Sequence, residues 1–125
     1  MKTLTVGIGS KRNASAQQIE SAVRAALALA GRSLDEVLAA ATIDSKAREP
    51  GLVEFCTRHG LLLHTFAPEQ IDALGELPTP SDTVRAHLGV DGVCEPCALL
   101  ASPGAKLIVS KTTLDGVTVA IASAH

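Results

Sequence analysis

The chain has 125 residues, of which 46% are hydrophobic and 19% charged, so it is long enough for one domain, 1–125, and too apolar to be intrinsically disordered. Its formal net charge is −2 and its aromatic residues are Phe55 and Phe66, with no Trp or Tyr. Nucleic-acid binders normally carry a basic excess and stacking aromatics, so we expect no nucleic-acid partner.

The sequence also bears on membranes and on the cellular compartment. The longest uncharged apolar run, Ala25–Ala30, is far shorter than the ~20 residues that span a bilayer. The N-terminus lacks the apolar stretch of a signal peptide, and three Cys, an odd number, do not suit a secreted disulfide framework. We therefore expect a cytoplasmic protein with no membrane partner.

The first third of the chain predicts a strand, a loop and a helix. Apolar residues alternate within 3–9, which favours a strand. Ser15 and Gln18 have the spacing of a capping box, and Gly31 is a natural stop for the helix that begins there.

The rest of the chain continues the alternation of helices and strands. A second capping box, Ser33 with Glu36, predicts a short helix through Val37 and Leu38. The later predicted elements are a strand at 39–43, a helix at 50–59, a buried strand at 61–66, short helices at 69–74, 81–88 and 94–101, and strands at 106–110 and 117–122. This order predicts an α/β domain with a mixed, mainly parallel sheet of about five strands, closed by an antiparallel hairpin.

The loop after the first strand has the features of an anion site. Gly7 and Gly9 give backbone freedom, Ser10 follows them, and Lys11 and Arg12 bring two cations next to a helix N-terminus, whose dipole favours anions. We expect this loop to bind a carboxylate or phosphate. The alternative is a turn with two solvated cations.

The loop after the second strand concentrates charge between a strand and a helix. Thr42 begins it, and Asp44, Lys46 and Glu49 follow within a few residues. Lys46 is expected to pair with a ligand carboxylate, while Asp44 or Glu49 acts as a general base or positions Lys46. Alternatively, Glu49 interacts favourably with the dipole of its own helix and Asp44 caps a turn. Because both loops follow strands and precede helices, we expect them on one edge of the sheet.

A third motif, Cys94-Glu95-Pro96-Cys97, matches the spacing of redox-active thiols at a helix start. The alternative, which we favour, is a set of small apolar residues that pack a short helix. Zinc would require two further ligands, and the spacing of the candidates suggests no tetrahedral set: Cys56, His59, His64, His87 and His125. We expect no metal and no cofactor.

Several short motifs, spread in order over nearly the whole chain, together point to a known family. They are Gly7-Ile8-Gly9 with Lys11-Arg12, Thr42-Ile43 with Lys46, Glu49 and Leu52, Ser81 with Val84, Gly89-Val90, Val93, Glu95, Ala98, and Lys111 before 117–122. In these positions the chain resembles cobalamin-biosynthesis proteins of the CobE type and the C-terminal domain of CbiG. It departs from them at Ser10, where the family often has Cys, and at Cys97, where many relatives have Ala.

The resemblance implies a three-layer α/β/α fold and a role in converting the carboxylate-rich tetrapyrrole intermediates of vitamin B12 synthesis. Full-length CbiG opens a lactone of cobalt-precorrin-5A and releases acetaldehyde. We therefore expect the chain to bind a precorrin or cobalt-precorrin and to assist lactone opening or intermediate transfer. If it is an enzyme, it is a hydrolase. The alternative is a non-catalytic module that docks on another enzyme of the pathway.

The expected site joins these cations with a few neighbours. Lys11, Arg12, Lys46 and Lys111 are expected to hold ligand carboxylates, with Ser81 beside them. The candidates for a base that activates water are Glu49, Glu95 and Asp44.

Overall fold

The computed structural model describes residues 3–10, 13–73, 94–102 and 104–123. Within these ranges the strands are β1 (Leu4–Ser10), β2 (Val37–Ile43), β3 (Leu62–Phe66), β4 (Lys106–Leu114) and β5 (Val117–Ser123). The helices are α1 (Ala16–Leu29), α2 (Pro50–His59), α3 (Pro68–Ala73) and α5 (Cys94–Ala101), with two 3-10 helices, η1 (Leu34–Glu36) and η2 (Asp44–Lys46). The helix predicted at 81–88 lies outside the described residues.

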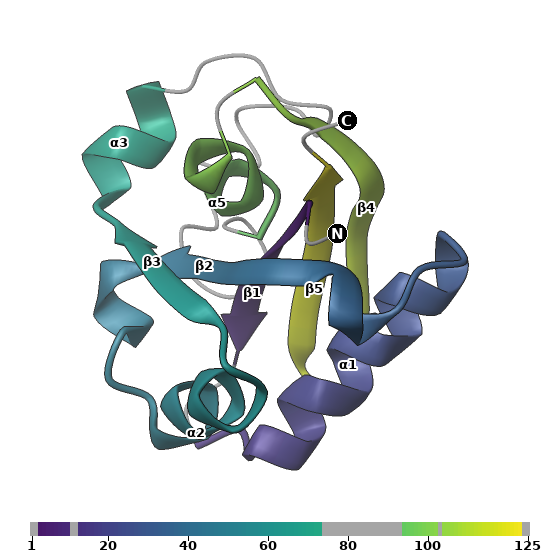
Figure 1. Cartoon of the computed structure of the whole chain (residues 1–125). Helices are drawn as coiled ribbons and strands as arrows, with labels where there is room; N and C mark the ends of the chain where they lie inside the picture. Colours follow the sequence, from purple (N-terminus) through teal and green to yellow (C-terminus); the bar gives the residue numbers. More distant parts are fainter. Residues whose placement is uncertain (1–2, 11–12, 74–93, 103, 124–125) are drawn as a thin grey trace.

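The strands form one sheet in the order β3-β2-β1-β5-β4 (Figure 1). β1, β2 and β3 are parallel neighbours, β5 runs antiparallel to β1, and β4 runs antiparallel to β5. Within this sheet, β5 alone therefore runs against the other four strands. The predicted mixed, mainly parallel five-stranded sheet with a closing hairpin is confirmed. As a result, β1 and β2 end at the same edge of the sheet.

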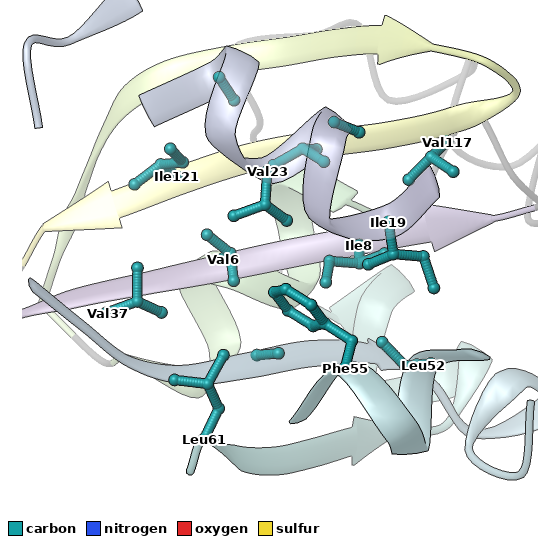
Figure 2. Close-up of a cluster of buried hydrophobic side chains, with 14 of the residues drawn as sticks. Val6, Ile8, Ile19, Val23, Val37, Leu52, Phe55, Leu61, Val117 and Ile121 are labelled. Atoms are coloured by element: carbon teal, nitrogen blue, oxygen red, sulfur yellow. The ribbon is translucent and has the colours of Figure 1, made fainter. Parts of the chain in front are cut away.

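The sheet is the middle of three layers, with α1 and α2 on one face and α5 on the other (Figure 1). Under α1 and α2 the core consists of large side chains. Figure 2 shows the Phe55 ring among aliphatic groups of α1, α2 and the strands, including Ile8 and Leu52, and these three side chains are fully buried. This interlocking layer removes the most apolar surface from water and is the main stabilising core.

The opposite face of the sheet carries small side chains in its central strands, and larger ones, Ile43 and Phe66, near the ends of β2 and β3. Ala41 and Ala120 lie in the central strands, and Gly7 lies in β1 directly beneath α5. A Cβ atom at Gly7 would overlap the backbone carbonyl oxygen of Cys94, so only glycine lets α5 approach β1 this closely. The backbone of α5 therefore rests almost directly on the backbone of β1.

Local sequence signals account for the ends of the two long helices. The amide of Gln18 donates to Ser15 Oγ at 3.0 Å and the amide of Ser15 donates to Gln18 Oε1 at 2.9 Å, which confirms the capping box. α2 begins at Pro50 and ends at Gly60, whose φ of 65° is the left-handed conformation that glycine adopts most readily.

Three predicted segments differ from the structure because strand pairing overrides the local signal. Val37 and Leu38 belong to β2 rather than to a helix, since Val37 pairs with Leu4 of β1 and the capping box starts only the single turn η1. β4 extends to Leu114 because its last three residues, from Thr112 to Leu114, still pair with β5. β3 is an edge strand, and Leu62 is 58% exposed where a buried strand was predicted.

None of the helices in the described part of the chain has both the length and the apolar character needed to cross a membrane. This finding applies to α1, which is the longest of them, as well as to the shorter helices. The buried residues of α1 all lie on one side of the helix, so its apolar residues serve to pack it against the sheet.

Candidate functional site

The loops after β1 and β2 meet at the carboxyl edge of the sheet. The backbone amide of Asn13, in the first loop, donates to Glu49 Oε1, in the second, at 2.9 Å. These two residues are 36 positions apart in the chain, so the contact depends on the parallel pairing of β1 with β2. Lys11 and Arg12, the predicted cations of the first loop, lie outside the described residues.

A second contact holds the same two loops together. Gly51, in the first turn of α2, lies so close to Ala14 that a Cβ atom would overlap the Ala14 carbonyl oxygen. Asn13 adopts a φ of 67°, a left-handed conformation in which Asn is enriched among non-glycine residues. The N-termini of α1 and α2 are thereby held side by side at one edge of the sheet.

A pocket of about 460 Å³ opens between these two helix N-termini. Ser15 and Gln17 of the first loop and helix line one side, and Pro50 and Gly51 line the other. Arg58, which also lines the pocket, pairs with Glu54 one turn earlier in α2. The positive ends of two helix dipoles therefore face a shared space, an arrangement that favours negatively charged groups.

The predicted residues of the second loop lie at this edge at different depths. Thr42 is buried, and its hydroxyl donates to the carbonyl oxygen of Ile8 at 2.7 Å, so it ties β2 to β1 beneath the surface. Asp44 is exposed in η2, whereas Lys46 and Glu49 are half-buried. Of these four predicted residues, Asp44, Lys46 and Glu49 have side chains that reach the surface and can meet a ligand.

The predicted residues at the end of β1 contribute to the frame of the edge. The carbonyl oxygen of Gly9 accepts a hydrogen bond of 3.2 Å from the hydroxyl of Thr118, and Ser10 is 1% exposed. Gly7 serves the close approach of α5 described above. Ser81, the other predicted binding residue, lies outside the described residues.

On the α5 side of the sheet, two further predicted residues are in direct contact. Glu95, in the first turn of α5, is 4% exposed, and its Oε2 accepts a hydrogen bond of 2.9 Å from the backbone amide of Lys111 in β4. The side chain of Lys111 is exposed. Glu95 is therefore tied into the structure, whereas Lys111 presents its cation to solvent.

The three cysteines are free thiols, and all are buried. Burial raises the pKa of Cys94 and of Cys97 to about 12, and that of Cys56 to about 11. A thiol that keeps its proton at neutral pH is a poor nucleophile, so the geometry favours the packing interpretation of the Cys94–Cys97 motif over a redox one.

A charged cluster that the sequence analysis did not identify joins α1 to α2. Glu20 accepts from Arg24 Nε at 2.8 Å, and its other oxygen lies 2.9 Å from His59 Nε2. The hydrogen bonds from Arg24 and His59 lower the pKa of Glu20. The spacing of Glu20 and Arg24 is visible in the sequence as an i, i+4 pair, but the contact with His59 requires the packing of the two helices.

Metal binding finds no support in the part of the chain that the structure describes. There, the His, Cys, Asp and Glu side chains form no group of three or more that could hold an ion. Glu20 with His59 is a pair, and the buried thiols lie on both faces of the sheet rather than in one cluster.

Comparisons with known proteins agree with this arrangement of strands and helices. A cobalt-precorrin-5A hydrolase from Priestia megaterium is 34% identical over 121 residues, which cover 97% of this chain and 32% of that protein. Protein CobE from a Sinorhizobium species is 30% identical over 121 residues, covering 95% of this chain and 79% of that protein. The crystal structure of CobE, a protein from the cobalamin (vitamin B12) biosynthetic pathway, matches with a TM-score of 0.82 and 31% identity over 96% of this chain and 92% of that one.

The chain thus spans about a third of the length of the hydrolase but most of the length of CobE. The family described as cobalamin synthesis G C-terminus matches residues 4–122, which include β1 to β4 and all but the last residue of β5. The expected resemblance is confirmed by this match, and the three-layer fold agrees with it. The chain belongs to the cobalamin synthesis G C-terminus family.

Proposed function

We propose that this domain binds a precorrin-type tetrapyrrole intermediate of cobalamin biosynthesis through the carboxylates of the ligand, at the carboxyl edge of the sheet. The observation that carries the proposal is the hydrogen bond from Asn13 to Glu49, which brings the loops after β1 and β2 together. Lys46 lies in one of these loops, and Lys11 and Arg12 immediately precede Asn13 in the other.

The chemistry of the ligand class suits this edge. Precorrins carry acetate and propionate groups, and charge-assisted hydrogen bonds to Lys or Arg contribute roughly 1.5–3 kcal/mol each when shielded from water. The paired N-termini of α1 and α2 add donors and a favourable potential for the same groups. Several modest contacts of this kind select a polycarboxylate over a neutral ring.

We further propose that the domain assists the opening of a lactone or the transfer of the intermediate. In lactone hydrolysis a base takes a proton from water, the hydroxide oxygen bonds to the lactone carbonyl carbon, and the ring C–O bond breaks to leave a carboxylate and a hydroxyl. Glu49 and Asp44 are better placed for this role than Glu95, because they reach solvent at the edge while Glu95 is 4% exposed.

A non-catalytic docking module is the second candidate. The observation in its favour is that the chain corresponds to 32% of the length of the related hydrolase, so the related region works there as part of a larger protein. In this case the domain would bind another enzyme of the pathway and would show no affinity of its own for the tetrapyrrole.

Titration with uroporphyrin, a stable porphyrin polycarboxylate, separates the two candidates. We expect the wild type to bind, Arg12→Ala and Lys46→Ala to weaken binding about tenfold or more at low salt, and added salt to weaken the wild type. Lys106→Ala is the matched control. Lys106 pairs with Ser123, which pairs with Leu4 at the start of β1, so it lies at the end of the sheet away from the two loops. If both edge variants bind as the wild type does, the site lies elsewhere and the docking module is favoured.

A hydrolytic role has its own test with the lactone-containing substrate of the pathway. Glu49→Gln keeps the oxygen that accepts from Asn13 and removes the basic carboxylate. We expect it to bind uroporphyrin as the wild type does while the rate of lactone opening falls by about a hundredfold or more. An unchanged rate in both Glu49→Gln and Asp44→Asn would exclude these residues as the base.

A further inference from the structure

Glu95 differs from an ordinary acidic residue at a helix start. Such residues usually lie on the surface, where they favour the helix dipole, but Glu95 is 4% exposed. A buried carboxylate is retained only when hydrogen bonds replace the water it has lost. One of these bonds comes from the backbone amide of Lys111, 16 residues later in the chain.

The amide of Lys111 lies where β4 departs from regular pairing. The register of β4 against β5 shifts between Val109 and Thr112, and Lys111 falls within this interval. β4 is an edge strand whose partner in the described sheet is β5. The bond from Glu95 therefore attaches an irregular segment of an edge strand to a helix on the adjacent face.

Glu95 is itself held firmly in place. The carbonyl oxygen of the preceding residue, Cys94, lies against Gly7 of β1, so the start of α5 cannot move toward the sheet. Burial raises the pKa of the Cys94 thiol to about 12, and the nearby positive charge of Lys111 opposes part of this rise. The hydrogen bond from its amide to Glu95 therefore holds the backbone of Lys111 at the start of α5, while its side chain is exposed.

We propose that Glu95 is a positioning residue: by holding the backbone of Lys111, it keeps the Lys111 cation beside the start of α5, where it binds a carboxylate of the tetrapyrrole. This inference rests on the proposed function and adds a second cationic contact, on the α5 side of the sheet, to the loops after β1 and β2. Lys111 is level with the middle of β1 across β5, because Val109 and Thr112 lie opposite the β5 residues that pair with Val6 and Ile8. A ligand that contacts both Lys111 and the loop after β1 therefore extends about 10 Å across the strands and about 10 Å along them, which a ring with several carboxylate arms can do.

A positioning role for Glu95 and a role as a general base depend on different properties of its side chain. Positioning requires only an oxygen that accepts from the amide of Lys111, and Glu95→Gln retains one. A base requires the ionised carboxylate, which Glu95→Gln removes. Glu95→Ala removes both, and Lys111→Ala removes the cation while leaving the backbone amide in place.

The experiment is a double-mutant cycle with uroporphyrin as the probe, using the folded fraction of each variant. We expect Lys111→Ala and Glu95→Ala each to weaken binding about tenfold, and the double variant to bind no more weakly than either alone, because both changes remove the same contact. Glu95→Gln should bind within about twofold of the wild type. Lys106→Ala, which changes the same residue type at the start of β4, should have no effect.

Several results would overturn the inference. Unchanged affinity in Glu95→Ala, effects that multiply in the double variant, or a Glu95→Gln variant as weak as Glu95→Ala would each exclude positioning through Lys111. Should Glu95→Ala fail to fold, Glu95→Asp takes its place in the cycle, since it withdraws the carboxylate by one methylene. Loss of binding in Lys46→Ala but not in Lys111→Ala contradicts this inference alone. A wild type that binds no uroporphyrin contradicts the proposed function and the inference together.

Discussion

The two faces of the sheet are built on different principles. Toward α1 and α2 the sheet presents large side chains that surround Phe55, whereas the central strands present Gly7 and alanines to α5, with Ile43 at the end of β2. The first face gains stability from the burial of apolar area. The second buries less apolar area per residue but brings the backbone of α5 against β1, which sets the position of Glu95 and Cys94.

Because of this difference, one face mainly provides the stability of the fold and the other mainly sets the position of α5. A large core tolerates a change of shape at the expense of free energy, because neighbouring side chains relax into part of the space. A contact between two backbones has no side chain that can move aside, so a single added carbon shifts a whole helix. We therefore expect changes on the α1 and α2 face to alter mainly the free energy of unfolding, and changes on the α5 face to alter mainly the geometry near Lys111.

The largest expected effect is on the large-residue face. Phe55 is fully buried and packs its ring 5.1 Å from the ring of His59, so Phe55→Ala should lower the free energy of unfolding by about 3–5 kcal/mol. Urea unfolding measures the loss. Leu62→Ala, at a residue 58% exposed on β3, is the control and should change stability by less than about 0.5 kcal/mol. Equal losses in the two variants would contradict the division between the faces.

Gly7→Ala tests the small-residue face. The new methyl group would overlap the carbonyl oxygen of Cys94, so we expect a loss of about 3 kcal/mol and a displaced α5. Thiol labelling under native conditions distinguishes the faces, because Cys94 and Cys97 are buried residues of α5 while Cys56 is a buried residue of α2 on the other face. Labelling should increase at Cys94 and Cys97 and remain slow at Cys56.

The control for Gly7→Ala is its neighbour Val6, whose side chain points to the opposite face. Val6→Ala should lower stability by leaving a cavity under α1, without increased labelling of the α5 thiols, Cys94 and Cys97. If Val6→Ala labels Cys94 as fast as Gly7→Ala does at equal stability, labelling reports general opening and the helix has not been displaced.

Unfolding at alkaline pH provides a further comparison of the buried thiols on the two faces. The unfolded thiols ionise near their ordinary pKa of 9.0, whereas burial raises the pKa of Cys94 and Cys97 to about 12. Folding therefore loses stability as the pH rises above about 9, by up to ~1.4 kcal/mol per pH unit for each thiol. Urea unfolding at about pH 8 and about pH 10 should show a smaller difference in Cys94→Ala/Cys97→Ala than in the wild type. Cys56→Ala, which removes one buried thiol rather than two, should reduce the difference less.

The smallest expected effect concerns the polar contact at the margin of the large-residue face. Arg24 and His59 lower the pKa of Glu20, so the contribution of Glu20 to stability is complete above its ordinary value of 4.5 and is lost as the pH falls through the lowered value. Glu20→Gln should flatten the decline of stability below about pH 4.5. Glu54→Gln, which breaks an ion pair within α2 alone, is the control. A steeper decline in Glu20→Gln would contradict this assignment.

Local signals in the sequence located most helices and strands. The capping box of Ser15 with Gln18 and the Pro50 start of α2 are found where they were predicted, because each depends on neighbours within one helical turn. The prediction was wrong at Val37 and Leu38, where pairing with β1 outweighs the local preference.

The candidate site was predicted as separate residues rather than as an arrangement. Glu95 and Lys111 were both named from the resemblance, but their contact depends on how α5 lies on β4. Glu49 was named as a base or a helix-start acid, and its hydrogen bond to Asn13 depends on the parallel pairing of β1 and β2. Gly7 was assigned to a ligand, while the structure supplies a packing reason for it that no local pattern contains.

By itself, the sequence determined the alternation of strands and helices, the family resemblance, and the chemical character of two charged loops, because these depend on the order and spacing of residues. The tertiary structure alone decided the strand order β3-β2-β1-β5-β4, the exposure of β3 at an edge, and the contacts that join Asn13 to Glu49 and Glu95 to Lys111. Each of these requires segments far apart in the chain to be brought together. The free energy of such contacts comes from burial and long-range pairing, which local patterns do not encode.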